Sequence, residues 1–269
     1  VAILVTLFCI IGWTLTKLPD SLVAVTGALG LVAGGVLKEE HLYASLGSEL
    51  VWLLIAAFVI AAVLRASGLM ETVALQISRP FHSATGLFYG LTAFIAATAF
   101  IIPSTSGRAA LLLPVSLSLS AAMPDPRLRK PLGLLFPSVI LLSAGGSLIG
   151  AGAHLIAVDA MVRAGHAPLS FDGWFALAFP FAMLSSLAAA TLILLLFVPK
   201  ELRHARLKMQ SLEAKPLDSR QKRLGAGLCV VIATWVLQPL HGFGVALVAL
   251  TAAMAFTMPL FTEKKPKEI

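Results

Sequence analysis

The chain of 269 residues is 58% hydrophobic and only 12% charged, with a formal net charge of +7. Soluble domains carry about 25% charged residues, so this chain has too few charges to cover a water-facing surface. The composition excludes a soluble enzyme, a disordered chain and a disulfide scaffold. It predicts an integral membrane protein, which we expect to be all-α. We expect it to cross the inner (plasma) membrane several times, with the lipid bilayer as its partner. Nucleic acid is not an expected partner, because 8 of the 20 Lys and Arg residues cluster between 200 and 223.

In chain order, several apolar segments approach the length of about 20 residues that crosses the hydrocarbon core of a bilayer. They are residues 1–16, 20–37, 49–66, 172–198, 224–240 and 243–260. A shorter stretch, Glu71–Arg79, predicts a helix at the membrane interface. Together the segments predict a multi-span helical bundle.

Two further regions do not fit a simple span. Residues 84–122 form two apolar arms joined by the polar sequence Pro103-Ser104-Thr105-Ser106-Gly107-Arg108. This region predicts a re-entrant hairpin, with an ordinary helical hairpin and a polar extracellular turn as the alternative. Residues 131–163 are too long for one span and are glycine-rich from Gly145 to Gly152, which predicts a broken helix.

The basic residues predict the orientation of the chain. With the Lys200–Arg223 loop placed inside, nearly all Lys and Arg fall on the same side, and only Lys38 and Arg163 lie outside, with Arg108 between the hairpin arms. Such a bias is typical of cytoplasmic loops. We therefore expect loops 123–131 and 199–223 and the C-terminus, with Lys264, Lys265 and Lys267, to be cytoplasmic.

A partial internal repeat relates the two ends of the chain. Ile10–Leu37 and Ile232–Pro259 align at an offset of 222, and Trp13 and Trp235 coincide. Five net crossings separate the copies, so they would be inverted, as in many secondary transporters. This predicts an inverted-repeat transporter whose second repeat is incomplete. The expected parts are scaffold helices of repeat 1 (1–80), a transport part (81–198, with hairpin 84–122, broken helix 131–163 and span 172–198), a basic cytoplasmic linker (199–223) and the start of repeat 2 (224–269).

The hairpin tip carries groups that can bind ions. The hydroxyls of Ser104, Thr105 and Ser106, with nearby free carbonyls, can coordinate a dehydrated cation, and the N–H groups that open the second arm can meet an anion. Arg108 is costly in an apolar stretch, so we expect it to face a polar cavity and the substrate. Snorkelling or a structural ion pair is the alternative for Arg108.

The glycine-rich segment Gly145–His154 is the second candidate. Its glycines let backbone approach a ligand closely, and Ser147 and His154 add polar groups. His154 can titrate near neutral pH, although a structural histidine and helix packing through small residues are the alternatives. We expect Asp159 to pair with Arg163 at i+4.

Motifs of enzymes and metalloproteins are missing from the sequence. It has no Gly-x-Ser-x-Gly elbow, His-Glu-x-x-His pair, Walker loop or Cys/His cluster. We therefore expect neither enzymatic activity, nor a cofactor, nor a transition metal.

The two candidate segments resemble signatures of a known family. Ser104-Thr105-Ser106 followed by Ala109–Pro114 is similar to the Ser-Asn-Thr motif and Leu-Leu-Pro run of the divalent anion:sodium symporter family, in the ion transporter superfamily. Leu148–Ile156 resembles the family's Ile-Gly-Thr-Pro-Pro-Asn segment. Thr105 and His154 stand where that family has Asn.

The resemblance implies sodium bound between the hairpin tip and the broken helix, a substrate carboxylate or sulfate at the same tip, a homodimer and an elevator-like movement. Residues and resemblance together predict sodium-coupled symport of small di- or tricarboxylates or sulfate-like anions. The expected substrate ligands are Ser104, Thr105, Ser106, Gly107, Arg108 and His154. The expected sodium ligands are Ser104, Ser106, Gly146, Ser147, Gly150, Ala151 and Gly152. Open alternatives are a proton-coupled, arsenite or cation transporter of the same superfamily, and a non-transporting half-length membrane scaffold.

Overall fold

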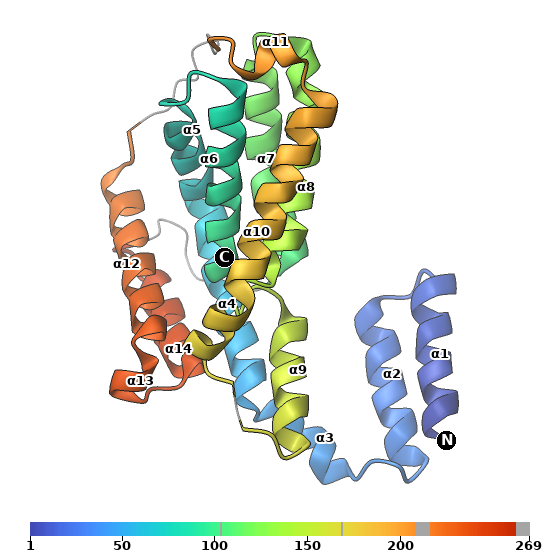
Figure 1. Cartoon of the computed structure of the whole chain (residues 1–269). Coiled ribbons are helices and arrows are strands. Elements are labelled where there is room, and N and C mark those ends of the chain that lie inside the picture. Colours follow the sequence, from blue (N-terminus) through green and yellow to red (C-terminus); the bar gives the residue numbers. More distant parts are fainter. Residues whose placement is uncertain (103, 168, 208–215, 262–269) are drawn as a thin grey trace. The chain divides into compact units, whose positions relative to one another are not determined.

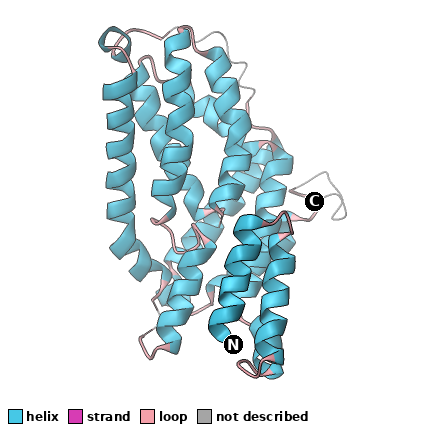
Figure 2. Ribbon diagram, turned by 90° about the vertical axis from the view of Figure 1, so that its right-hand side faces the viewer, coloured by secondary structure: helices cyan, strands magenta, loops and turns pink. Residues whose placement is uncertain are grey.

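The computed structural model describes residues 1–102, 104–167, 169–207 and 216–261. Within these ranges all regular structure is helical (Figure 2), which confirms the all-α prediction. The chain divides into two compact units, Val1–Trp52 and Leu53–Ile269. Pro103 of the predicted tip, part of the predicted linker (208–215) and the predicted cytoplasmic tail from 262 onward lie outside the described residues.

The first unit is built on a helical pair. It contains α1 (Ala2–Leu15), α2 (Asp20–Ala33), α3 (Glu39–Leu46) and the start of α4 (Glu49–Ser67). α1 and α2 pack closely because glycines leave room for side chains of the opposite helix. A Cβ at Gly27 would collide with Cys9 Sγ, and one at Gly12 would lie 2.8 Å from a methyl of Val23. The pair therefore depends on small residues, as helix pairs in membranes commonly do.

The second unit is a helical bundle around α8 (Figure 1). α8 packs against α6, α7 and α10, and α12 packs against α10 and α14. The core between these helices contains apolar side chains that are 0% exposed, such as Leu91, Leu112, Leu135 and Val139. The elements of this unit, besides the rest of α4, are α5 (Leu69–Ser78), α6 (Ala84–Ala97), η1 (Thr98–Phe100), α7 (Thr105–Ala122), η2 (Pro126–Leu128), α8 (Arg129–Ala144), α9 (Gly152–Arg163), α10 (Phe171–Phe197), α11 (Lys200–Arg203), α12 (Ser219–Val236), α13 (Gln238–His241) and α14 (Val245–Phe256).

Helices occupy every predicted segment, and the ends that shift have local causes. α2 stops at Ala33 rather than 37, because Gly34 and Gly35 follow and Gly35 adopts φ +68°. α12 starts at Ser219, five residues before the expected start, because Asp218 and Gln221 form a reciprocal capping box. The interruption inside 131–163 is present as the segment Gly145–Ala151 between α8 and α9, called the break below.

Three helices of the second unit begin with the same Ser-x-x-Gly cap. The hydroxyl oxygens of Ser83, Ser104 and Ser170 accept from the N–H groups of Gly86, Gly107 and Gly173, at 3.2, 3.1 and 3.3 Å. Glycine suits the third position because a Cβ there would press on the capping serine, at 3.3, 3.3 and 3.1 Å from its side-chain atoms. These serines explain where α6, α7 and α10 start.

Two helical stretches of the described residues, Glu39–Ser67 and Phe171–Phe197, are long and apolar enough to cross a membrane. α10 turns large apolar side chains away from the core: Leu177, Phe181 and Leu196 are 73%, 75% and 71% exposed. An apolar face of this kind marks a surface that meets lipid or another protein.

Each of the two helical pairs of the predicted repeat contains a hydrogen bond of the same kind. In the first pair the indole N–H of Trp13 donates to Asp20 O at 3.2 Å, and in the second that of Trp235 donates to Val245 O at 3.1 Å. Each indole thus ties the first helix of its pair to the start of the second. The tryptophans that align in sequence therefore make the same kind of hydrogen bond, and the repeat itself stays a prediction.

Candidate functional site

The hairpin tip (Ser104–Arg108) lies where α7 begins. Ser104 is the N-cap of α7: its backbone is extended (φ −151°, ψ 122°) and its carbonyl accepts the first helical bond from Arg108 N at 2.9 Å. Ser104, Thr105 and Gly107 are half-buried and Ser106 is exposed. The Ser104 hydroxyl keeps a second lone pair and its proton for another partner, so capping does not exhaust it.

Arg108 is 0% exposed, and protein acceptors hold its guanidinium. Nε donates to Thr98 Oγ1 at 3.0 Å, Nη1 to Ile140 O at 3.0 Å, and Nη2 to Ile95 O and Ser143 Oγ, both at 2.7 Å. Four of its five N–H donors are thereby used. The predicted contact with substrate stays a prediction, and this geometry gives the side chain no open surface through which to make it.

The two hydroxyls that receive Arg108 are themselves anchored. Thr98 Oγ1 donates to Ile95 O at 2.6 Å, and Ser143 Oγ donates to Val139 O. Each hydroxyl is therefore fixed to its own helix while it accepts from the arginine. Thr98 and Ser143, buried at 2% and 3% exposure, were not singled out by the sequence, where lone hydroxyls in apolar stretches are common.

The break is buried and turns tightly. Gly146, Ser147, Leu148, Ile149 and Gly150 are all buried. Backbone turns link Gly146 N to Ser143 O at 3.1 Å and Gly150 N to Ser147 O at 2.9 Å. A Cβ at Gly150 would collide with the carbonyl oxygen of Ala144. Only glycine fits there, because the neighbouring atom belongs to backbone that cannot rotate away.

Side chains from outside the break satisfy two of its carbonyls. The indole N–H of Trp174, on α10, donates to Gly145 O at 2.9 Å, and Nδ1 of His154 bonds to Ser147 O at 3.1 Å. Because a carbonyl only accepts, the second bond places a proton on Nδ1 and leaves Nε2 as the basic nitrogen. The two rings lie against each other, with centroids 5.0 Å apart. The sequence does not predict this bond, because a tryptophan near the end of a span is typical of an anchor at the membrane interface.

Ser147 has a buried hydroxyl without a hydrogen-bond partner in the part of the chain that the structure describes. The residue is 1% exposed. Buried polar atoms are nearly always bonded, so this hydroxyl has bonding capacity left for a further partner. It belongs to the predicted sodium ligands.

An aromatic cluster links the hairpin to the break. The ring centroid of Phe100, just before the tip, lies 5.8 and 6.0 Å from the ring centroids of Phe175 and Phe179 on α10. A Cβ at Gly146 of the break would lie 3.3 Å from Phe179. Through Arg108 and this cluster the structure brings the two predicted segments, Ser104–Arg108 and Gly145–His154, to the same region of the second unit.

Asp159 and Arg163 do not join that region. They pair with each other at 2.8 Å on α9, both well exposed, which confirms the predicted i+4 ion pair. No group of three or more His, Cys, Asp or Glu side chains that could hold a metal occurs among the residues whose placement is described. Two apolar cavities of about 550 and 500 Å³ lie along α12–α14 and between α5 and α6, and no predicted ligand residue lines either of them.

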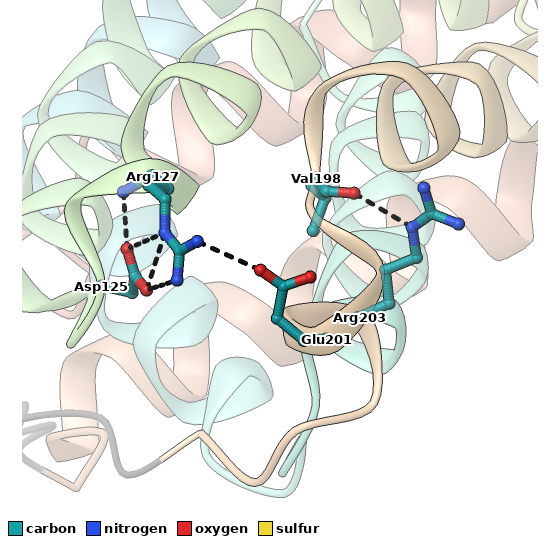
Figure 3. Close-up of polar contacts among 5 residues, drawn as sticks. All are labelled: Asp125, Arg127, Val198, Glu201 and Arg203. Atoms are coloured by element: carbon teal, nitrogen blue, oxygen red, sulfur yellow. Dashed lines mark hydrogen bonds and ion pairs between the residues drawn. The ribbon is translucent and has the colours of Figure 1, made fainter.

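A polar cluster closes the end of the bundle that the sequence predicts to be cytoplasmic (Figure 3). Arg127 binds Asp125 at 2.8 Å and Glu201, on α11, at 3.1 Å. The hydrogen bond from the Arg127 side chain lowers the pKa of the Asp125 carboxyl from its ordinary value. Arg203 caps the end of α10 by donating to Val198 O at 3.0 Å. The loop after α10 is thus tied to the turn between α7 and α8.

Comparisons with known proteins were made against this geometry. The sequence profile of a family described as citrate transporter matches residues 10–269. Over 141 residues the chain is 32% identical to dicarboxylate transporter 2, chloroplastic, of Spinacia oleracea, which covers 51% of this chain and 25% of the relative. Over 207 residues it is 25% identical to a sodium-dependent dicarboxylate transporter of Staphylococcus saprophyticus, covering 72% and 38%. The aligned part is therefore well under half the length of either relative.

Proposed function

Because this chain belongs to the citrate transporter family, we propose that it forms part of a sodium-coupled symporter of citrate or similar di- and tricarboxylates. The resemblance in the candidate segments and the match of the family profile agree on the class of carboxylate transporters. Both relatives are named as dicarboxylate transporters, and one is named as sodium-dependent. The assignment is to transport and not to catalysis.

The proposed setting is a multi-pass inner-membrane protein that acts as a homodimer. Residues 1–80 would be scaffold, 81–198 would move with the substrate in an elevator-like step, and 224–269 would open the second, inverted repeat. The exposed apolar face of α10 supports the membrane setting, and the clustering of basic residues in 199–223 supports the orientation.

The observation that carries the proposal is the orphaned hydroxyl of Ser147 inside a buried break of a helix. In secondary transporters, unwound carbonyls and helix C-termini coordinate sodium, while helix N-termini meet anionic substrate groups. The break follows the C-terminus of α8, and the tip opens the N-terminus of α7. Ser147 and carbonyls of the break, together with the hydroxyl of Ser104 at the tip, would hold sodium. The N–H groups and hydroxyls of Thr105 and Ser106 would meet a carboxylate.

The test is uptake of radiolabelled citrate into liposomes that contain the natural full-length protein, under a sodium gradient. Ser147→Ala should raise the sodium concentration for half-maximal uptake about tenfold, as expected for a lost oxygen ligand. Ser78→Ala is the matched control, since Ser78 is equally buried but its hydroxyl already donates to Ala74 O at 2.7 Å.

The outcome separates this proposal from its alternatives. Equal sodium affinity in the Ser147→Ala and wild-type proteins would remove Ser147 from the sodium site. Uptake that follows a pH gradient without sodium would favour proton coupling, with Nε2 of His154 as the first group to test. A protein that transports neither citrate nor other carboxylates would favour a scaffold role.

A further inference from the structure

Arg108 lies at the junction of three helices, and we propose that it is a positioning residue. Its guanidinium holds the start of α7 against the end of α8, and so fixes the hairpin tip relative to the break, without itself binding the transported anion. The inference rests on the proposed function, because it concerns the geometry of the same ion site.

The four hydrogen bonds of Arg108 divide evenly between two partners. Thr98 Oγ1 and Ile95 O, at 3.0 and 2.7 Å, belong to the end of the first hairpin arm. Ile140 O and Ser143 Oγ, at 3.0 and 2.7 Å, belong to the last turns of α8. One side chain on the second arm therefore holds both the first arm and α8. A planar fork with five donors can do this, whereas the point charge of a lysine cannot.

Electrostatics favour this role over substrate binding. No carboxylate of the described residues lies within salt-bridge distance of Arg108. Its acceptors instead lie at the C-terminal ends of α6 and α8, and each helix end carries roughly half a negative charge. These two helix ends lower the cost of burying the guanidinium charge. A guanidinium that is 0% exposed and bonded to protein acceptors at these helix ends has no surface to offer a passing anion.

The position of the bonds in the chain makes them relevant to the ion site. Arg108 directly follows Gly107 of the tip, and Ser143 lies two residues before Gly145, where the break begins. If the tip moved away from the break, the charge-assisted hydrogen bonds of Arg108 would have to stretch. Because these bonds are buried, losing them costs free energy that water does not restore. The two halves of the proposed sodium site are therefore held at a fixed spacing.

The test combines hydrogen exchange with transport in the natural full-length protein. Arg108→Lys keeps the charge and loses the fork. We expect faster amide exchange in two peptides at once, one covering Ser104–Gly107 and one covering Gly145–Ala151, and a rise of about tenfold in the sodium concentration for half-maximal citrate uptake. Arg129→Lys, at an exposed arginine at the start of α8, should change neither measurement.

A milder variant guards against misfolding. Ser143→Ala removes one acceptor and should raise the half-maximal sodium concentration about threefold, with no further rise when it is added to Arg108→Lys.

Unchanged exchange in both peptides of Arg108→Lys would overturn the inference, as would faster exchange with unchanged sodium affinity. A rise in the KM for citrate with normal exchange would also overturn it, in favour of a substrate contact. Failure of the wild-type protein to show sodium-driven uptake would instead overturn the proposed function, and the exchange measurement would still decide whether Arg108 joins tip and break.

Discussion

The hairpin tip and the break interrupt helices in opposite ways. At the tip, the cap is local: Ser104 accepts from Gly107 three residues on, and Thr105, Ser106 and Gly107 are half-buried or exposed. At the break, the carbonyl of Gly145 is bonded by Trp174, 29 residues away, and the backbone is buried. The cap of the tip therefore depends on neighbouring residues alone, whereas the break also depends on a distant side chain.

The largest effect is expected where the break admits no side chain. Gly150→Ala would push a Cβ into the carbonyl oxygen of Ala144, and we expect a loss of about 3 kcal/mol in the free energy of unfolding. Gly145→Ala is the control within the same break, since a Cβ there meets nothing within 4 Å. Thermal unfolding in detergent checks both, and equal stability of the two variants would remove the contrast between crowded and open positions of the break.

The next effect tests the long-range bond. Trp174→Phe keeps an aromatic ring but removes the donor to Gly145 O, which leaves a carbonyl without this partner at a cost of about 2 kcal/mol. We expect a lower unfolding temperature and faster amide exchange in Gly145–Ala151. Trp52→Phe, at a tryptophan that is 47% exposed, serves as control. An unchanged exchange rate in the Trp174 variant would show that the break is held by its own turns.

A smaller effect separates capping from ion binding at the tip. Ser104→Ala and Ser83→Ala remove the same type of cap, at 3.1 and 3.2 Å, and each should cost about 1 kcal/mol of stability. Only Ser104→Ala should also weaken the sodium dependence of citrate uptake, because only Ser104 lies at the proposed site. If both variants alter sodium dependence alike, Ser104 acts only as a cap.

The smallest effect lies far from both interruptions. The pKa of Asp125 is lowered in the folded protein by its hydrogen bond from Arg127, so the stabilisation is present above the ordinary carboxyl pKa. It is lost as pH falls through the lowered value. Asp125→Asn should therefore flatten slightly the fall of the unfolding temperature in acid. The control is Asp159→Asn, at the exposed pair with Arg163, and a matching acid profile of the Asp125 variant and wild type would contradict the prediction.

Sequence predicted what is encoded locally. Apolar length gave the helices, the polar run after residue 103 gave the tip, and glycine density gave the break. It could not predict that Arg108 reaches Ile140 O and Ser143 on another helix, because hydrogen bonds that span 32 and 35 residues depend on how helices pack. An arginine in an apolar stretch looks the same whether it faces a substrate or the ends of two helices.

The fluorescence of Trp174 can also report on the environment of the break. Indole emission shifts in energy with the dipoles around the ring, and this indole touches both a backbone carbonyl of the break and the imidazole of His154. With Trp13, Trp52 and Trp235 replaced by phenylalanine, the chain would carry a single tryptophan, which can be excited apart from the two tyrosines. The wavelength of its emission maximum would then report changes in the break in real time, in a lipid vesicle and without any attached label.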